Sequence, residues 1–410
     1  MSHTAPKWEC IEGDLATPLG FRTAAVAAGL KKKRDALDLA LIFSDSPATT
    51  AAGVFTTNRV AAAPVLISRR HLDASRGHCR AIVVNSGNAN ACTGSEGIRA
   101  AEEIASRTAD LLGIKPFEVL VASTGVIGVK LDTLLVLQQL STLRDGLSRE
   151  HAKDTARAIM TTDTVPKICV VRSEVKGKAV NIAGIAKGAG MIHPHMATML
   201  SFITTDVALG ERMLHNLLIG AVSESFNRVT VDGDTSTNDT ALILASGLSE
   251  VAVIPGNESR AWFEEGLTLL CQTLARMIAR DGEGASKLVT VEVVGASTSH
   301  DAELVARAIA NSPLVKTALA GSDPNWGRII CAAGYSGAKF DPEKVDITVN
   351  QMPLCRKGVD TGFDEAVAHR ELDQKEVLLR VDLHTGSATA RIWTCDFTRE
   401  YIDINASYRT

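Results

Sequence analysis

Residues 187–200 read KGAGMIHPHMATML, and SFITTDVAL follows them at 201–209. The second run is apolar enough to form a buried strand. Gly188 and Gly190 permit a sharply bent backbone before it, and the bend delivers one hydroxyl, that of Thr198, to the start of the strand. We therefore expect Thr198 to be a nucleophile that first cuts the chain before itself and then works as a new N-terminus.

A threonine hydroxyl attacks poorly unless a base lies close to it. If Thr198 becomes an N-terminus, its own α-amine supplies that base, with a pKa of about 7.7–8.0, near the working pH that suits a general base. Ala197 is small, so the hydroxyl can reach its carbonyl. Attack gives an ester, and water then releases the new end. The alternative is that Thr198 is a β-branched residue that only begins a strand.

A second motif that combines hydroxyls with glycine, Ser123-Thr124-Gly125, follows a short strand expected at 119–122. The backbone N–H of Gly125 and the hydroxyl of Thr124 could both point at a developing oxyanion. A simple turn is an equally good interpretation of these residues taken alone.

The composition argues against several other functions. A net charge of −4 and an aromatic content of 4% disfavour nucleic-acid binding. The eight cysteines form no CxxC pair, and His193 and His195 lack a third ligand, so we expect reduced thiols and no metal. No phosphate loop and no dinucleotide-binding fingerprint occurs, so no nucleotide cofactor is predicted.

The first residues, MSHTAPKWECIEGD, lack the basic region and apolar core of a signal peptide. No apolar stretch approaches the roughly 20 residues that span a bilayer. We therefore expect a cytoplasmic protein without a membrane partner.

Expected strands and helices alternate, and the last third is richer in strands, with a boundary near 285–290. Strands are expected at 37–43, 80–84, 119–122, 179–185, 199–209, 228–232, 288–294, 345–354, 376–383 and 388–397. Helices are expected at 97–112, 131–143, 155–160, 211–227, 262–279 and 301–309.

The opening stretch resembles the cleavage-site motif of the bifunctional glutamate N-acetyltransferases/ornithine acetyltransferases of arginine biosynthesis. These enzymes cut themselves between the alanine and the threonine that correspond to Ala197 and Thr198. The similarity extends over nearly the whole chain and keeps the family's order of blocks. The other blocks are VNSGNANACTG, VASTGVIG, AIMTTD, VDGDTSTND, ARDGEGASK, GSDPNWGRI and INASYRT.

The resemblance implies a role for each matching residue. Thr198 would carry the acetyl group, and Thr124 and Gly125 would form the oxyanion hole. Lys187 offers a cation to an α-carboxylate, and Glu283 can hold an ammonium group. His195 stands where asparagine is expected in many members of the family. The positions that match substrate-binding residues are Thr161, Lys187, Thr198, Glu283, Asn405 and Thr410.

The same resemblance implies an α/β fold, a layered αββα sandwich like that of related self-cleaving aminopeptidases, with a smaller strand-rich C-terminal domain at about 288–397. Cleavage would give an alpha chain, 1–197, and a beta chain, 198–410, assembled as a heterotetramer of two chains of each kind. The implied reaction is a ping-pong transfer of acetyl from N-acetylornithine to glutamate. It needs no cofactor, and acetyl-CoA serves as an alternative donor in bifunctional members.

Two other functions remain compatible with the scaffold. A self-cleaving aminopeptidase or amidase would pass the acyl group to water, and a binding protein would keep the fold without cleavage. The AIMTTD block, Glu283 and the INASYRT tail favour the transferase.

Overall fold

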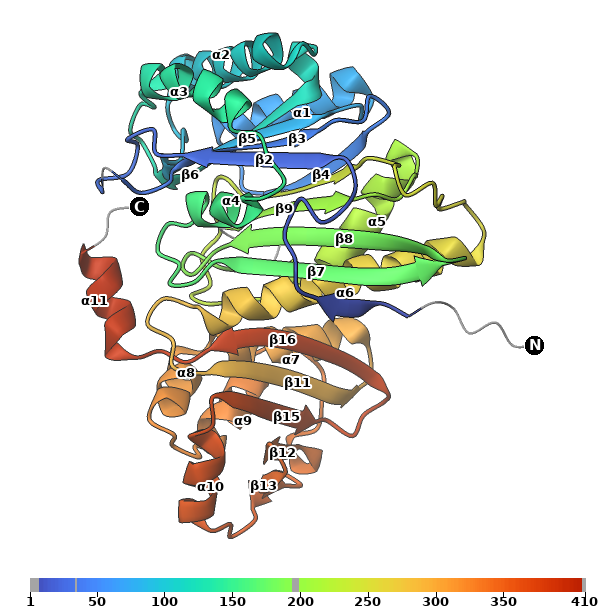
Figure 1. Cartoon of the computed structure of the whole chain (residues 1–410). Coiled ribbons are helices and arrows are strands. Elements are labelled where there is room, and N and C mark those ends of the chain that lie inside the picture. The colour runs from blue at the N-terminus through green and yellow to red at the C-terminus, as the bar shows by residue number, and fades with distance from the viewer. Residues whose placement is uncertain (1–6, 34, 194–198, 408–410) are drawn as a thin grey trace.

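The computed structural model describes residues 7–33, 35–193 and 199–407. Two sheets lie face to face with helices on their outer sides, which gives the αββα sandwich that the resemblance implied (Figure 1). The larger sheet has the order β1-β7-β8-β9-β10-β4, and the smaller sheet has the order β2-β3-β5-β6. Ala197 and Thr198, together with His195 and Thr410, lie outside the described residues.

The strands of the larger sheet come from both sides of the predicted cut. β8 and β9 pair antiparallel, from Ile182 opposite Thr205 to Lys187 opposite Leu200, and β9 and β10 pair parallel. The bounds are β1 Glu9–Ile11, β4 Thr50–Phe55, β7 Lys167–Val175, β8 Lys178–Lys187, β9 Leu200–Thr205 and β10 Thr240–Ala245. The strands of the smaller sheet are β2 Phe21–Val26, β3 Leu39–Ser44, β5 Ala81–Asn88 and β6 Val119–Val126.

Alternation along the strands explains the layers. In β5, Ile82 and Val84 point into the core between the sheets, while Ala81 and Val83 pack under the outer helices. Both faces are therefore apolar, as in strands that are covered on both sides. The helices over the smaller sheet are α1 Ala63–Ser75, α2 Gly94–Leu112 and α3 Thr133–Asp145, and α4 Ala152–Ala158 contacts strands of both sheets.

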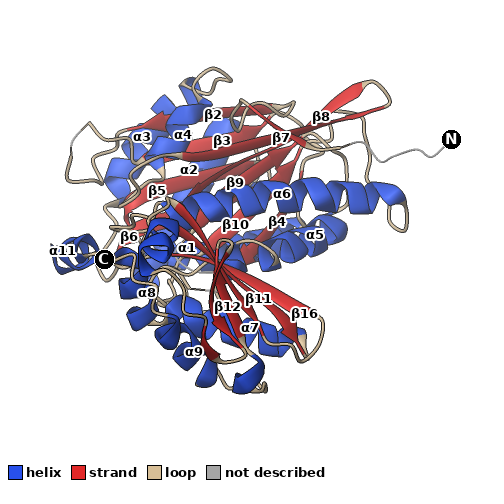
Figure 2. Cartoon of the chain, turned by 90° about the horizontal axis from the view of Figure 1, so that it is seen from below, coloured by secondary structure: helices blue, strands red, loops and turns tan. Residues whose placement is uncertain are grey.

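The opposite outer layer consists of α5 Glu211–Ser223 and α6 Glu258–Arg280, which lie side by side over the larger sheet (Figure 2). Leu267, Leu270 and Leu274 of α6 are buried against this sheet. Within the part of the chain that the structure describes, no helix combines the length and the apolar composition that a membrane span requires.

A third sheet lies below the sandwich in Figure 1 and has its own apolar core. Its order is β14-β13-β12-β15-β11-β16. The strands are β11 Leu288–Ala296, β12 Asp346–Val349, β13 Met352–Arg356, β14 Val359–Asp360, β15 Glu376–Asp382 and β16 Ala388–Cys395. The helices around it are α7 Ser299–Asn311, α8 Pro313–Ala320, α9 Trp326–Gly334 and α10 Glu365–Leu372, and α11 Arg399–Ser407 follows at the end.

The strand expected at 228–232 is wrong. The N–H of Thr230 donates to the carbonyl of Trp393 at 3.0 Å, whereas that of Val231 donates to Ile192 at 2.9 Å. Because successive backbone groups bond to two different segments, no continuous ladder forms. The strand expected at 80–84 is longer than predicted, since β5 continues to Asn88.

Trp8 fastens the N-terminal segment to α6. Its ring stacks on Trp262 with centroids 4.7 Å apart, and its Nε1 donates to the Trp262 carbonyl at 2.7 Å. We expect Trp8→Ala to lower the free energy of unfolding by about 3–5 kcal/mol, because it leaves a cavity and removes a buried hydrogen bond. Denaturant unfolding checks this, with the exposed Lys7→Ala as a control that should change the value by less than about 0.5 kcal/mol.

Candidate active site

A cavity of about 190 Å³ opens where the two sheets meet the C-terminal part of the chain. It gathers residues that are far apart in sequence. All of the predicted site residues that the structure describes line it: Thr124, Gly125, Thr161, Lys187, Glu283 and Asn405. Asp232, Asp234, Asn238 and Tyr401, which the sequence did not single out, also line it.

The Thr124-Gly125 pair lies near the end of β6, where its pairing with β5 becomes irregular. Gly125 has φ = 129°, and a Cβ there would lie 2.4 Å from the Gly87 carbonyl carbon, so only glycine fits. Asn238 fixes this strand end, because its Nδ2 donates to the carbonyl of Ser123 at 2.8 Å. Ser123-Thr124-Gly125 is thus a continuation of strand β6. Gly125 is held in a backbone conformation that a simple turn would not require.

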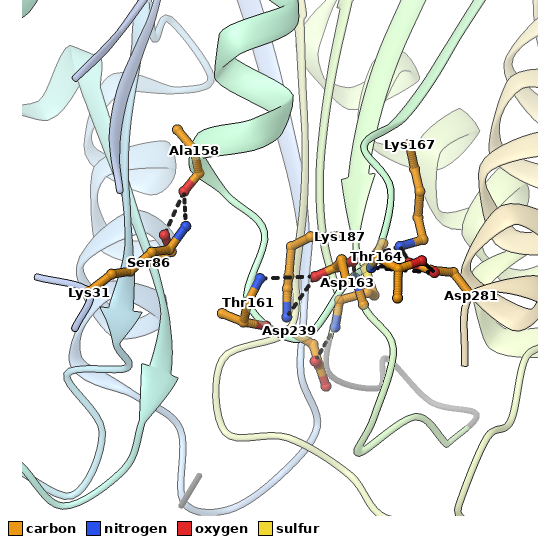
Figure 3. A network of polar contacts seen from close by, with 12 residues as sticks. Lys31, Ser86, Ala158, Thr161, Asp163, Thr164, Lys167, Lys187, Asp239 and Asp281 are labelled. Atoms are coloured by element: carbon orange, nitrogen blue, oxygen red, sulfur yellow. Dashed lines mark hydrogen bonds and ion pairs between the residues drawn. The ribbon is translucent and has the colours of Figure 1, made fainter. Parts of the chain in front are cut away.

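Lys187 ends β8 and is almost fully buried, with its side chain 3% exposed. Its Nζ lies 4.0 Å from the carboxylate of Asp163. That carboxylate also accepts from Lys167 at 2.6 Å and from the Gly188 N–H at 2.7 Å. Lys167 continues the network to Asp281 at 2.5 Å (Figure 3). Two buried cations and two carboxylates therefore compensate one another beside the cavity.

The network sets the charges of its members. Burial lowers the pKa of Lys187, and the carboxylate of Asp163 opposes that shift. Burial alone would raise the pKa of Asp163, but the ammonium groups of Lys187 and Lys167 and the Gly188 N–H outweigh it and hold the pKa well below its usual value. Asp163 is therefore an anion that keeps a cation available at the cavity wall.

The two glycines of the opening stretch serve different purposes. Gly188 has φ = 152°, a conformation that favours glycine. A Cβ on Gly190 would lie 2.2 Å from Oε2 of Glu283, so this position must stay free of a side chain for the carboxylate to approach. The N–H of Glu283 also donates to the carbonyl of Ala189 at 2.9 Å. Glu283 is thus fitted against the Lys187–Gly190 segment by close backbone contact.

Asn405 reaches the cavity from α11, a helix that the sequence did not predict because all its described side chains are at least partly exposed. Its Nδ2 donates to Oε2 of Glu283 at 2.8 Å. From the same helix, the Tyr401 hydroxyl donates to Asp232 at 3.4 Å. Figure 1 shows α11 beside the level at which the sandwich meets the third sheet.

Asp232 holds the segment that leads to the predicted cut. Its two carboxylate oxygens accept the N–H groups of Met191 at 2.6 Å and Ile192 at 2.8 Å. Burial raises the pKa of Asp232 to about 6, in spite of these hydrogen bonds. In the sequence, Asp232 belongs to the VDGDTSTND block. The sequence alone could not show that an acidic residue of this block contacts the backbone of residues 191–192.

Among the described residues, no group of three His, Cys, Asp or Glu side chains is arranged to hold a metal ion. The arrangement instead offers a cation, carboxylates, hydroxyls and backbone N–H groups around a small cavity. These are the groups that bind a zwitterionic amino acid and stabilise an oxyanion.

Comparison with known proteins decides the family. A model of the ArgJ family matches residues 22–410. The chain belongs to the ArgJ family. An arginine biosynthesis bifunctional protein ArgJ of Dehalococcoides mccartyi (strain CBDB1) is 49% identical over 401 residues, which cover 97% of this chain and 98% of that protein. The protein of the same name from Caldanaerobacter subterraneus subsp. tengcongensis (strain MB4) is 47% identical over 98% of this chain and 100% of its own length.

A crystal structure of the arginine biosynthesis bifunctional protein ArgJ from Bacillus halodurans is also similar. It shares 47% sequence identity and has a TM-score of 0.50, covering 52% of this chain and 100% of that chain. The family membership and the αββα fold inferred from the motifs are thereby confirmed. In this ArgJ family member the predicted site residues that are described share one cavity.

The Asp163 carboxylate should carry much of the stability of this site. We expect Asp163→Asn to lower the free energy of unfolding by about 3–5 kcal/mol at pH 7, because Lys167 and Lys187 lose their shared anion. The pKa of Asp163 is lower in the folded protein than in the unfolded chain, where an aspartate has a pKa of about 3.9. Its ionised carboxylate therefore stabilises the fold at pH values above about 3.9. The difference in the free energy of unfolding between the wild type and Asp163→Asn should therefore be fully present at pH 7 and become smaller as the pH falls below about 4.

Denaturant unfolding of both proteins at pH 7 and pH 3 measures this difference. Asp154→Asn is the matched control, because Asp154 forms an exposed pair with Arg157 at 2.8 Å and should contribute less than about 1 kcal/mol. Equal losses for the two variants would show that the buried network does not hold the site together.

Proposed function

We propose that this protein transfers the acetyl group of N-acetylornithine to glutamate, through an acetyl ester on Thr198. One observation carries the proposal: a single cavity is lined by Thr124 and Lys187 from before the predicted cut and by Glu283 and Asn405 from after it. The names of the ArgJ relatives, which place them in arginine biosynthesis, support the same function.

Each group has a defined task in the reaction. The hydroxyl oxygen of Thr198 attacks the acetyl carbon while its proton passes to the Thr198 α-amine. The Gly125 N–H and the Thr124 hydroxyl stabilise the negative charge on the acetyl oxygen. The carbon–nitrogen bond of the donor then breaks, and the α-amine returns the proton to the leaving nitrogen. Glutamate reverses these steps and leaves as N-acetylglutamate.

Substrate recognition follows from the charges at the cavity wall. Lys187 binds the α-carboxylate that donor and acceptor share, and Asp163 keeps its charge in place. Glu283 holds an ammonium group, and Thr161, Asn405 and Thr410 add hydrogen bonds. Acetyl-CoA is the alternative donor, and the reaction requires no bound cofactor.

Cleavage before Thr198 divides the chain into 1–197 and 198–410, and the pairing of β8 with β9 supports the idea that the fragments stay together. Two fragments of each kind then form the heterotetramer, and the protein works in the cytoplasm. The part of the beta chain from about 288 to 397 forms the smaller C-terminal domain.

The purified protein should run as two similar bands on a denaturing gel, one of them beginning at Thr198. Thr198→Ala should give one uncut band and activity at the level of the uncatalysed control, because cleavage and transfer use the same hydroxyl. N-terminal sequencing and the release of ornithine measure the two effects. Full activity from a single uncut band would exclude the mechanism.

The acetyl acceptor separates the transferase from an amidase. Incubation with N-acetylornithine and glutamate, without coenzyme A, should release ornithine and form N-acetylglutamate in equal amounts. An amidase would form acetate and ornithine whether or not glutamate is present. A separate assay with acetyl-CoA and glutamate measures whether acetyl-CoA acts as the second donor.

Glu283→Gln should raise the KM for N-acetylornithine about 10–100-fold, because a hydrogen bond to a charged group contributes about 1.5–3 kcal/mol. Initial rates over a range of donor concentrations measure this. Glu258→Gln, at the exposed opposite end of α6, is the control that should leave KM unchanged. An unchanged KM in both variants would remove Glu283 from the substrate site.

A further inference from the structure

The wall of the cavity carries an excess of negative charge. Asp232, Asp234 and Glu283 line it, and the hydroxyl of Tyr401 is influenced by all three carboxylates. Among the described residues around the cavity, Lys187 is the single cation, and Asp163 already balances it. Such a wall attracts a cationic side chain and disfavours an anionic one.

The two proposed substrates differ in the charge at the end of the side chain. N-acetylornithine ends in a δ-ammonium group, whereas glutamate ends in a γ-carboxylate. Both have an α-carboxylate, and both exchange acetyl at the α-nitrogen, so one cavity must receive both side chains along the same wall. An inference about this wall therefore rests on the proposed function and adds to it the means by which two opposite charges are accepted.

The carboxylate of Asp232 has one acceptor position that the protein fills only loosely. An ionised carboxylate offers about four such positions. Three accept the N–H groups of Met191, Ile192 and Asp234, at 2.6, 2.8 and 3.3 Å. The remaining position, on Oδ2, receives the Tyr401 hydroxyl at 3.4 Å, well beyond the roughly 2.7–2.8 Å that is usual for two oxygens. A polar group of a ligand in the cavity can therefore bind between the two side chains.

The ring of Tyr401 is held in place while its hydroxyl proton remains free to turn. The ring stacks on Phe397 with centroids 4.6 Å apart. Phe397 in turn donates its N–H to the carbonyl of Lys316 at 3.1 Å, and the Lys316 ammonium lies 4.5 Å from the centre of the Phe397 ring. A phenolic hydroxyl can donate or accept, so a fixed Tyr401 suits a ligand group of either charge.

We propose that Oδ2 of Asp232 and the hydroxyl of Tyr401 bind the end of the substrate side chain. With N-acetylornithine, Asp232 is an anion that accepts a hydrogen bond from the δ-ammonium group. With glutamate, one proton from the solvent lies between Oδ2 and the γ-carboxylate, and Tyr401 turns its O–H toward the γ-carboxylate. The proton returns to the solvent when N-acetylglutamate leaves, so the site ends in its initial state.

The surroundings of Asp232 favour the uptake of this proton. Two carboxylates that share a site cannot both remain ionised, so one of them is protonated near neutral pH. Burial and the charge of Asp234 raise the pKa of Asp232 to about 6, against the opposing effect of its N–H partners. The other titratable groups near it are Tyr401 on α11, Lys316 on α8, Cys395 on β16 and, beside Gly233, His193.

Calorimetric titration of the purified enzyme with glutamate and with ornithine tests the proposal. Neither amino acid carries an acetyl group, so no transfer accompanies binding. Titrations at pH 7 in two buffers of different ionisation enthalpy measure the protons taken up. Glutamate should take up about one proton more than ornithine, since the α-groups are the same in both and cancel. Equal proton uptake by the two amino acids overturns the proposal.

Asp232→Asn should abolish this difference in proton uptake, because an amide does not ionise in this range. It should also raise the Kd for ornithine about 10-fold or more, through loss of a charged hydrogen bond. The Kd for glutamate should stay within about 3-fold of the wild type, since the new NH₂ group can donate to the γ-carboxylate. A variant that keeps the difference in proton uptake overturns the role of Asp232.

Asp206→Asn is the matched control. Asp206 is a buried carboxyl whose pKa is also raised by burial, but it follows β9 at the end opposite Leu200. It accepts N–H groups from Leu19 and Asn181 at 3.0–3.1 Å. This variant should keep the wild-type difference in proton uptake. Its loss here as well would show that the difference does not come from the cavity, and would overturn the proposal.

Tyr401→Phe tests the same contact without altering the carboxylate, and it serves if Asp232→Asn does not fold. The ring can still stack on Phe397, and only the hydroxyl is removed. The Kd for glutamate should rise about 10-fold or more, with that for ornithine within about 2-fold. Equal losses for the two amino acids overturn the role of Tyr401.

Failure of the proposed function is a separate outcome, because it appears as absence of acetyl transfer in the wild type. Binding of both amino acids with equal proton uptake, by an enzyme that transfers acetyl, overturns only the roles of Asp232 and Tyr401. A wild type that binds neither amino acid overturns both.

Discussion

The antiparallel pairing of β8 with β9 is the constraint on which the rest of the structure depends. This pairing places Lys187 opposite Leu200, at the end of the larger sheet where the cavity opens. It also brings the two ends of the intervening segment, Gly188 and Met199, to neighbouring strands. A bond within such a connection can be cut without removing a strand from the sheet, so the scaffold tolerates the chemistry proposed for it.

Around that pairing, the site consists of short contacts from distant parts of the chain. Asp163 balances two buried lysines, Gly190 leaves space for Glu283, and Asn405 bonds to the same carboxylate from α11. Charged groups at such depth are stable only when each has a partner. The cavity therefore presents fixed charges to a small polar molecule, instead of a flexible surface that must rearrange.

Much of this could be predicted from sequence. Apolar runs such as Leu39–Ser44 and the spacing of α6 identify elements, and the motif around Thr198 identifies the family. Contacts between remote segments could not be predicted: Asp163 and Asp232 lie in polar blocks that resemble ordinary loops until their partners are placed. Residues 228–232 show the limit of alternation as a signal, because their N–H groups bond to two separate segments. The exposed helix α11 lacks the apolar stripe on which helix prediction relies.

The pairing of β8 with β9 has a consequence for how the protein reaches its final state. An uncut chain folds by a unimolecular process, in which the two strands are joined by a short connection and closing the loop costs little entropy. Once the connection is cut, the same strands belong to separate molecules, and renaturation becomes a second-order reaction that slows on dilution. The cleaved enzyme would then stay folded because its unfolding barrier is high, since the unimolecular folding reaction of the uncut chain is no longer available to it.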